Sequence, residues 1–126
     1  MVVYSYNHQV RPPAPYLEVE VVNPASGISE GVPAKMDTGA SISVVPERLV
    51  TDLELVPAGE RLCTGYDGRS SVRTIYLGTV KVADVTFEEI ELLAAPRADF
   101  LLGRDILNQF NLTLRGKDLT FEIEDP

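Results

Sequence analysis

The sequence has very few residues of the kinds that build disulfides and metal sites. Cys63 is the only cysteine and His8 the only histidine among 126 residues. A single cysteine cannot form a disulfide within the chain, so nothing indicates an oxidising compartment. No acid or base accompanies Cys63 in the manner of a nucleophilic thiol, and we expect an inert strand residue there. A lone histidine makes neither a metal site nor a catalytic triad, so we expect no bound metal.

Positive charge and long apolar runs are also scarce. Lys and Arg number 11 against 19 Asp and Glu, which gives a net charge of -8. Binding of nucleic acid needs clustered Lys and Arg, so this balance argues against it, and an acidic surface that aids solubility is the simpler interpretation. No stretch approaches a membrane span, and the N-terminus lacks the pattern of a secretory signal. We expect a soluble, cytoplasmic protein without nucleic-acid or membrane partners.

Helical periodicity is rare, and alternation of apolar and polar residues dominates. Residues 1–15 end in Arg-Pro-Pro-Ala-Pro, which predicts an extended segment that is neither helix nor central strand. "YLEVEVV" (16–22) and "VPAKM" (32–36) alternate with period two, and Lys35 falls on the face opposite Met36. Asp67-Gly68 between two strand-like runs predicts a hairpin. Further strand-like runs cover 59–66, 69–77, 78–82, 87–95 and 112–124.

Two short segments favour helix. Pro46 suits the first position of a short helix at 46–50, because its missing N–H is not needed there. "GRDILNQF" (103–110) has the clearest helical character, and we expect Asp105 to cap it. The chain length suits one domain. We therefore predict an all-β domain over 16–126, with one conspicuous helix near its C-terminus, preceded by the extended segment 1–15.

The stretch "AKMDTGASISVVP" (34–46) places a carboxylate, Asp37, where an apolar strand ends. A buried carboxylate without a partner costs several kcal/mol or more, so some other group must compensate for its charge. Gly39 permits a tight turn, and the small residues after it describe a carboxylate exposed on a rigid loop. On these residues alone, an ordinary turn rich in Asp and Gly remains the alternative.

"AKMDTGAS", followed downstream by "FLLGRDILNQF", resembles the retropepsin-like aspartic proteases. The resemblance extends from Tyr16 to about Thr120, in the order and spacing of that family. It implies a single-domain closed β-barrel with one short helix in the C-terminal half. It also implies one Asp-Thr-Gly loop per chain and a glycine-containing hairpin, the flap, at residues 64–71, which closes over a bound peptide.

The same resemblance implies how the protein works. Family enzymes of this size are symmetric homodimers in which Asp37 would meet its own copy at the two-fold axis. Two carboxylates so close cannot both ionise easily, so one keeps a proton while the other activates a water molecule that attacks the peptide bond. The chain would be an endopeptidase acting on peptide or protein substrates, with no metal, cofactor or covalent intermediate.

Site residues follow from the resemblance one by one. Asp37 would be catalytic, Thr38 would brace the two loops across the axis, and the Gly39 carbonyl would contact the peptide. Tyr66 could shield the site from the flap, although an aromatic residue in a hairpin is more often a packing residue. The flap and cleft residues expected to bind substrate are Ala40, Tyr66, Asp67 and Gly68.

One position departs from the retroviral pattern. Retroviral members commonly carry an acid at the position of Ser41, where it pairs with the arginine of the Gly-Arg element. Many cellular relatives share the serine, but here Arg104 is left without that partner. Two alternatives to the enzyme remain: a non-catalytic peptide-binding or dimerisation module on the same fold, and an unrelated β protein with a fortuitous triplet.

Overall fold

The computed structural model describes residues 2–65 and 67–125, which form ten strands and two short helices. The helices are α1 (Glu47–Asp52) and α2 (Arg104–Leu107). The strands are β1 (Val2–Ser5), β2 (Tyr16–Val22), β3 (Ser29–Met36), β4 (Val44–Pro46), β5 (Val56–Thr64), β6 (Ser70–Val82), β7 (Val85–Ala95), β8 (Phe100–Leu102), β9 (Asn111–Arg115) and β10 (Thr120–Glu124).

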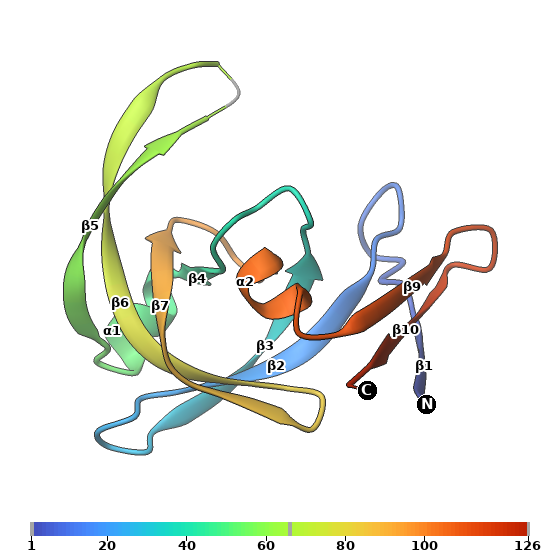
Figure 1. Ribbon diagram of the computed structural model, residues 1–126, viewed down its shortest axis with the longest axis horizontal. Helices are drawn as coiled ribbons and strands as arrows, with labels where there is room; N and C mark the ends of the chain where they lie inside the picture. Colours follow the sequence, from blue (N-terminus) through green and yellow to red (C-terminus); the bar gives the residue numbers. More distant parts are fainter. Residues whose placement is uncertain (1, 66, 126) are drawn as a thin grey trace.

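The larger sheet closes on itself. Its strands follow the order β2-β3-β8-β4-β7-β6-β5, and β2 also pairs with β6 (Figure 1). The ring therefore consists of β2, β3, β8, β4, β7 and β6, with β5 attached outside it. Closure satisfies the backbone groups that an open sheet would leave at its edges. The predicted closed β-barrel is confirmed.

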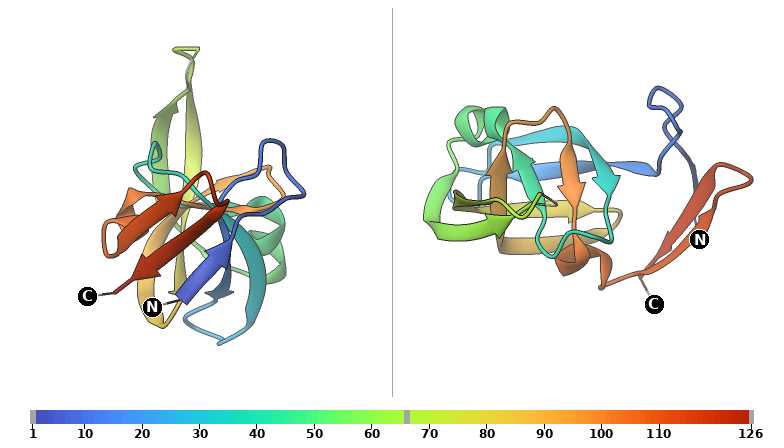
Figure 2. Two further views of the ribbon diagram at one scale, coloured as in Figure 1. Left: turned by 90° about the vertical axis from the view of Figure 1, so that its right-hand side faces the viewer. Right: turned by 90° about the horizontal axis from the view of Figure 1, so that it is seen from above.

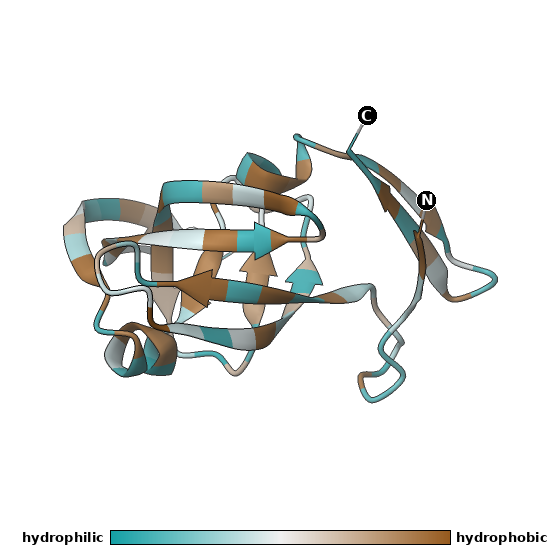
Figure 3. Cartoon of the chain, turned by 90° about the horizontal axis from the view of Figure 1, so that it is seen from below, coloured by the Kyte–Doolittle hydropathy of each residue, from teal (hydrophilic) through white to brown (hydrophobic). Residues whose placement is uncertain are grey.

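The barrel interior is built by the alternation seen in the sequence. On β3, Val32, Ala34 and Met36 are buried while Lys35 is exposed, so one face enters the core and the other faces outward. Figure 3 shows the same alternation of hydrophobic and hydrophilic residues along other strands. Each fully buried Val, Leu or Phe side chain contributes about 1.5–3 kcal/mol relative to an exposed one.

The chain ends form a smaller sheet with the order β1-β10-β9. β1 pairs with β10 antiparallel from Val2 opposite Ile123 to Ser5 opposite Thr120, which brings the two termini together (Figure 2). Tyr4 stacks on the buried ring of Phe121 with 5.2 Å between ring centroids. The sequence shows no sign of this pairing, because it joins opposite ends of the chain. The division of the chain at residue 15 stays a prediction.

The helix boundaries correct the sequence analysis in detail. α1 begins after Pro46, which is its N-cap and not its first residue. α2 is the expected short helix of the C-terminal half, but it ends at Leu107 and its N-cap is Gly103. The prediction that Asp105 is the N-cap of α2 is wrong, because Gly103 has that position and Asp105 lies inside the helix, where its carboxylate binds Ser43 and the Ile106 N–H.

The runs 69–77 and 78–82 form one continuous strand, β6, and not two. Gly78 lies where β6 approaches Leu92: a Cβ at this glycine would be 2.8 Å from Leu92 Cδ1. The glycine therefore permits close packing and a local register shift between Gly78 and Val80, instead of a turn. Neither helix in the described part of the chain is long and apolar enough to cross a membrane.

Candidate active site

Asp37 follows directly after β3 and is half-buried, so its carboxylate lies outside the barrel core. Its N–H donates to the Leu102 carbonyl at 2.9 Å, which ties the end of β3 to the end of β8. Its Oδ1 accepts from the Gly39 N–H at 2.9 Å, and its carbonyl accepts from the Ala40 N–H at 3.2 Å. Residues 37–43 are here called the Asp37 loop, and its first four residues therefore turn tightly beside the carboxylate.

Ser43 and Asp105 fasten the far end of the Asp37 loop to α2. The Ser43 hydroxyl donates to Asp105 Oδ1 at 2.7 Å, and the Ser43 N–H donates to Asp105 Oδ2 at 3.0 Å. The same hydroxyl oxygen accepts from the Gly103 N–H at 3.0 Å. Ser43 is fully buried, so these bonds satisfy groups that water does not reach. The sequence analysis missed Ser43, although a hydroxyl in the apolar run "SISVV" was a usable signal, and it gave Asp105 only the role of a helix cap.

Gly103 allows the backbone of the Asp37 loop to lie directly on the start of α2. The Arg104 N–H donates to the Ala40 carbonyl at 2.8 Å. A Cβ at Gly103 would lie 2.8 Å from the Ile42 carbonyl carbon and 3.1 Å from the Ala40 carbonyl oxygen. Both are backbone atoms, which cannot rotate away. Space, not an unusual φ, therefore requires glycine at this position.

Arg104 has a partner of a different kind from the one in retroviral sequences. Its Nη1 donates to the Thr38 carbonyl at 2.8 Å, so the guanidinium supports the Asp37 loop through the backbone. Ser41 is exposed and supplies no carboxylate. Because the Arg104 side chain is also exposed, we expect this bond to add little to stability.

A row of directly paired residues runs across the sheet beside Asp37 on the face away from the core. Lys35 stands opposite Tyr16 on one side and Leu101 on the other. From Leu101 the row continues through one apolar residue each of β4, β7 and β6. Most of these apolar residues are buried, yet they do not belong to the main core cluster. We call this set the outer row: Tyr16, Lys35, Leu101, Val44, Leu93 and Ile75.

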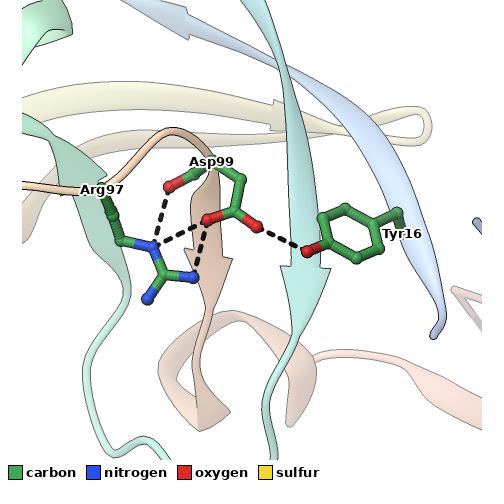
Figure 4. A network of polar contacts seen from close by, with 3 residues as sticks. All are labelled: Tyr16, Arg97 and Asp99. Carbon is green, nitrogen blue, oxygen red and sulfur yellow. Dashed lines mark hydrogen bonds and ion pairs between the residues drawn. The ribbon is translucent and has the colours of Figure 1, made fainter. Parts of the chain in front are cut away.

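A cluster of polar side chains stands at the charged end of the outer row (Figure 4). The Tyr16 hydroxyl donates to Asp99 Oδ2 at 2.6 Å. Arg97 donates to Asp99 Oδ1 through Nε at 2.9 Å and Nη2 at 2.7 Å. Burial and the bond to Asp99 raise the pKa of Tyr16 to about 12. Burial opposes ionisation of Asp99, but the bonds from Tyr16 and Arg97 outweigh it and hold the pKa of Asp99 below its usual range.

Replacement of Tyr16 with Phe tests this cluster. The lost bond to an ionised carboxylate is expected to lower the free energy of unfolding by about 1.5–3 kcal/mol near neutral pH. A depressed pKa of Asp99 contributes stability that is present above the unfolded value, near about 3.9, and is lost as pH falls through the folded value. The difference between wild type and variant should therefore shrink in acid. Urea unfolding of both proteins at the same protein concentration measures this difference in the free energy of unfolding. A difference that is independent of pH would contradict the prediction.

The predicted hairpin is present: β5 pairs with β6 from Val56 opposite Leu77 to Thr64 opposite Ser70. Across the hairpin near its turn, the hydroxyl oxygens of Thr64 and Ser70 lie 2.9 Å apart. Gly68 has φ 76, and Asp67 Oδ1 accepts from the Arg69 N–H at 3.0 Å. Both residues of the expected turn thus have local roles in it, whereas Tyr66 lies outside the described residues.

In the outer half of this hairpin, the described residues of β5 and β6 pair only with each other. β6 pairs with β7 only from Ile75 onward, so residues 70–74 have β5 as their one strand neighbour among the described residues. Figure 1 shows the hairpin extending well beyond the barrel. Such a segment opens more easily than strands that are paired on both sides.

The family model described as aspartyl protease matches residues 25–106. No curated protein matches the chain. The solution structure of simian foamy virus protease is 29% identical, with a TM-score of 0.55, covering 75% of this chain and 92% of that one.

Two further structures are similar in fold. The protease of EIAV, solved with the inhibitor HBY-793, is 21% identical with a TM-score of 0.59, covering 83% of this chain and 92% of that one. A retropepsin-like aspartic protease from Rickettsia conorii is 16% identical with a TM-score of 0.59, covering 95% of this chain and 86% of that one.

Proposed function

Because the chain belongs to the aspartyl protease family and has the retropepsin-like fold, we propose that it is an aspartic endopeptidase active as a symmetric homodimer. The observation that carries the proposal is the environment of Asp37. Among the described residues its carboxylate accepts one hydrogen bond, from the Gly39 N–H, and has no cation partner. A braced, half-buried carboxylate of this kind can face its own copy across a two-fold axis.

The chemistry then follows from the facing pair. Two carboxylates about 3 Å apart repel by about 5 kcal/mol at an effective dielectric constant of about 20, so the pair retains one proton. The ionised Asp37 takes a proton from a bound water, whose oxygen attacks the scissile carbonyl carbon. The protonated Asp37 donates to the carbonyl oxygen, and a proton then passes to the leaving amine. This cycle requires neither a metal nor a cofactor.

Neighbouring groups complete the proposed site. Thr38 and Gly39 are exposed in the single chain, so the Thr38 hydroxyl is accessible to a second copy and the Gly39 carbonyl to a peptide. The Ala40 carbonyl accepts from the Arg104 N–H and so holds the Asp37 loop to α2, and Ala40 would line the proposed cleft. The β5–β6 hairpin, with Asp67 and Gly68 at its turn, would act as the flap over the bound peptide.

Incubation with a diverse peptide library, with and without a transition-state-mimicking aspartic protease inhibitor, tests the function. We expect inhibitor-sensitive cleavage whose specific activity falls on dilution, because each site needs two chains. Activity should also fall at alkaline pH, because the pair must retain one proton. Sedimentation at the same concentrations reports the assembly, and a catalytically active monomer would contradict the homodimer.

A further inference from the structure

The outer row changes character at Lys35. From Leu101 onward its members are apolar and mostly buried, as suits the floor of a peptide site. Lys35 itself is an exposed cation, set between Leu101 and the polar cluster of Tyr16, Asp99 and Arg97. A purely apolar floor would serve any hydrophobic peptide, whereas a charge at this position discriminates among peptides.

Lys35 precedes Asp37 by two residues, so the alternation along β3 places both on the same side of the sheet. On β3 the odd-numbered residues point outward, since Val32, Ala34 and Met36 fill the core. Asp37 continues this alternation immediately after the strand. At about 3.3 Å per residue, Lys35 and Asp37 are separated by about 7 Å along the chain direction, roughly the spacing of alternate residues in an extended peptide.

The charge of Lys35 is not neutralised by its neighbours. In the described part of the chain Lys35 forms no ion pair. Asp99, which directly precedes β8, is already bound by the Tyr16 hydroxyl and by two nitrogens of Arg97. Lys35 thus presents an unpaired positive charge beside Asp37, on a chain whose net charge is -8.

We propose that Lys35 is a specificity-determining residue whose ammonium group binds an acidic side chain of the substrate close to the scissile bond. The proposal rests on the endopeptidase function proposed above. In the symmetric dimer two copies of Lys35 flank the pair of Asp37 residues, one on each side of the bond that is cut. An acidic residue on either side of that bond therefore finds a cation.

The test begins with a peptide that the wild-type dimer cleaves, identified from the library. It is resynthesised with Glu, Gln or Lys at each of three positions on either side of the cut. We expect at least one position where kcat/KM with Glu exceeds that with Gln by about threefold or more, with Lys below both. Added salt should reduce this preference, because it arises from charge.

Two substitutions of Lys35 then assign the preference to this residue. Lys35→Met retains an unbranched apolar stem and should bring the ratio of Glu to Gln close to one, whereas Lys35→Glu should invert the order so that Lys is preferred. Lys117→Glu changes the net charge by the same amount as Lys35→Glu, but it lies outside the outer row, on the exposed turn between β9 and β10. It should retain the wild-type ratio, which separates a local contact from general electrostatic attraction.

The outcomes separate the two proposals. If wild type cleaves peptides but shows no preference for Glu, or if both Lys35 variants keep the wild-type ratio, the specificity assignment is overturned and the endopeptidase function stands. A changed ratio in Lys117→Glu as large as in Lys35→Glu also overturns the assignment. If the wild-type dimer cleaves no peptide in the library, the proposed function itself fails, and the role of Lys35 fails with it.

Discussion

Asp37→Asn is expected to reduce kcat/KM by about 10²- to 10⁴-fold or more while leaving a folded dimer. Asn has almost the same shape as Asp, but its neutral amide cannot act as the base that takes a proton from water. The side-chain oxygen of Asn can still accept a hydrogen bond from the Gly39 N–H, as Asp37 Oδ1 does at 2.9 Å. The loop should therefore keep its conformation, and removal of the repulsion between the two facing carboxylates of the proposed homodimer should leave that dimer at least as stable.

The measurement compares steady-state cleavage with sedimentation for wild type and variant at the same concentrations. Asp84→Asn is a matched control, because the same chemical change then falls on an exposed residue in the turn between β6 and β7. It should cleave at the wild-type rate. Substantial cleavage by a pure preparation of Asp37→Asn would show that Asp37 is not the general base.

Gly103→Ala is expected to have the second largest effect, on stability and on activity together. A methyl group there would lie 2.8 Å from the Ile42 carbonyl carbon and 2.9 Å from its oxygen. Because both are backbone atoms, the Asp37 loop or α2 must move, at a cost of about 1–3 kcal/mol. The shift also displaces Asp37, and a misplacement of about 1 Å at a reacting group can cost about 10²-fold in rate.

Gly116→Ala supplies the control for this prediction. No heavy atom lies within 4 Å of a Cβ at Gly116, so the same substitution meets open space there. Its free energy of unfolding should change by no more than about 0.5–1 kcal/mol. Urea unfolding and kcat/KM of the three proteins are the measurements. Equal unfolding midpoints for Gly103→Ala and wild type would mean that the loop accommodates the methyl group, contrary to the packing described.

The sequence by itself was sufficient to predict the features that depend on residues adjacent in the chain. Alternation in "YLEVEVV" predicted β2 with its observed bounds, and the Asp67-Gly68 pair predicted the hairpin turn. The end of the apolar alternation at Met36 placed Asp37 just beyond a strand. These features follow from side-chain period and backbone preference within a few residues, which is the range over which local patterns act.

Other features of the site were decided only by tertiary structure. Ser43 meets Asp105, Arg104 meets Thr38 and Tyr16 meets Asp99 across separations of 62, 66 and 83 residues. No local pattern specifies these partners, because each contact depends on the register of strands that come together only when the barrel closes. Along the chain, Ser43 is marked only as a hydroxyl in an apolar run, and Arg104 only as an arginine without an acid at position 41. Neither pattern identifies the partner. The parallel pairing of β3 with β8 places Asp37 beside Leu102, and so brings the groups around α2 to the loop that they hold.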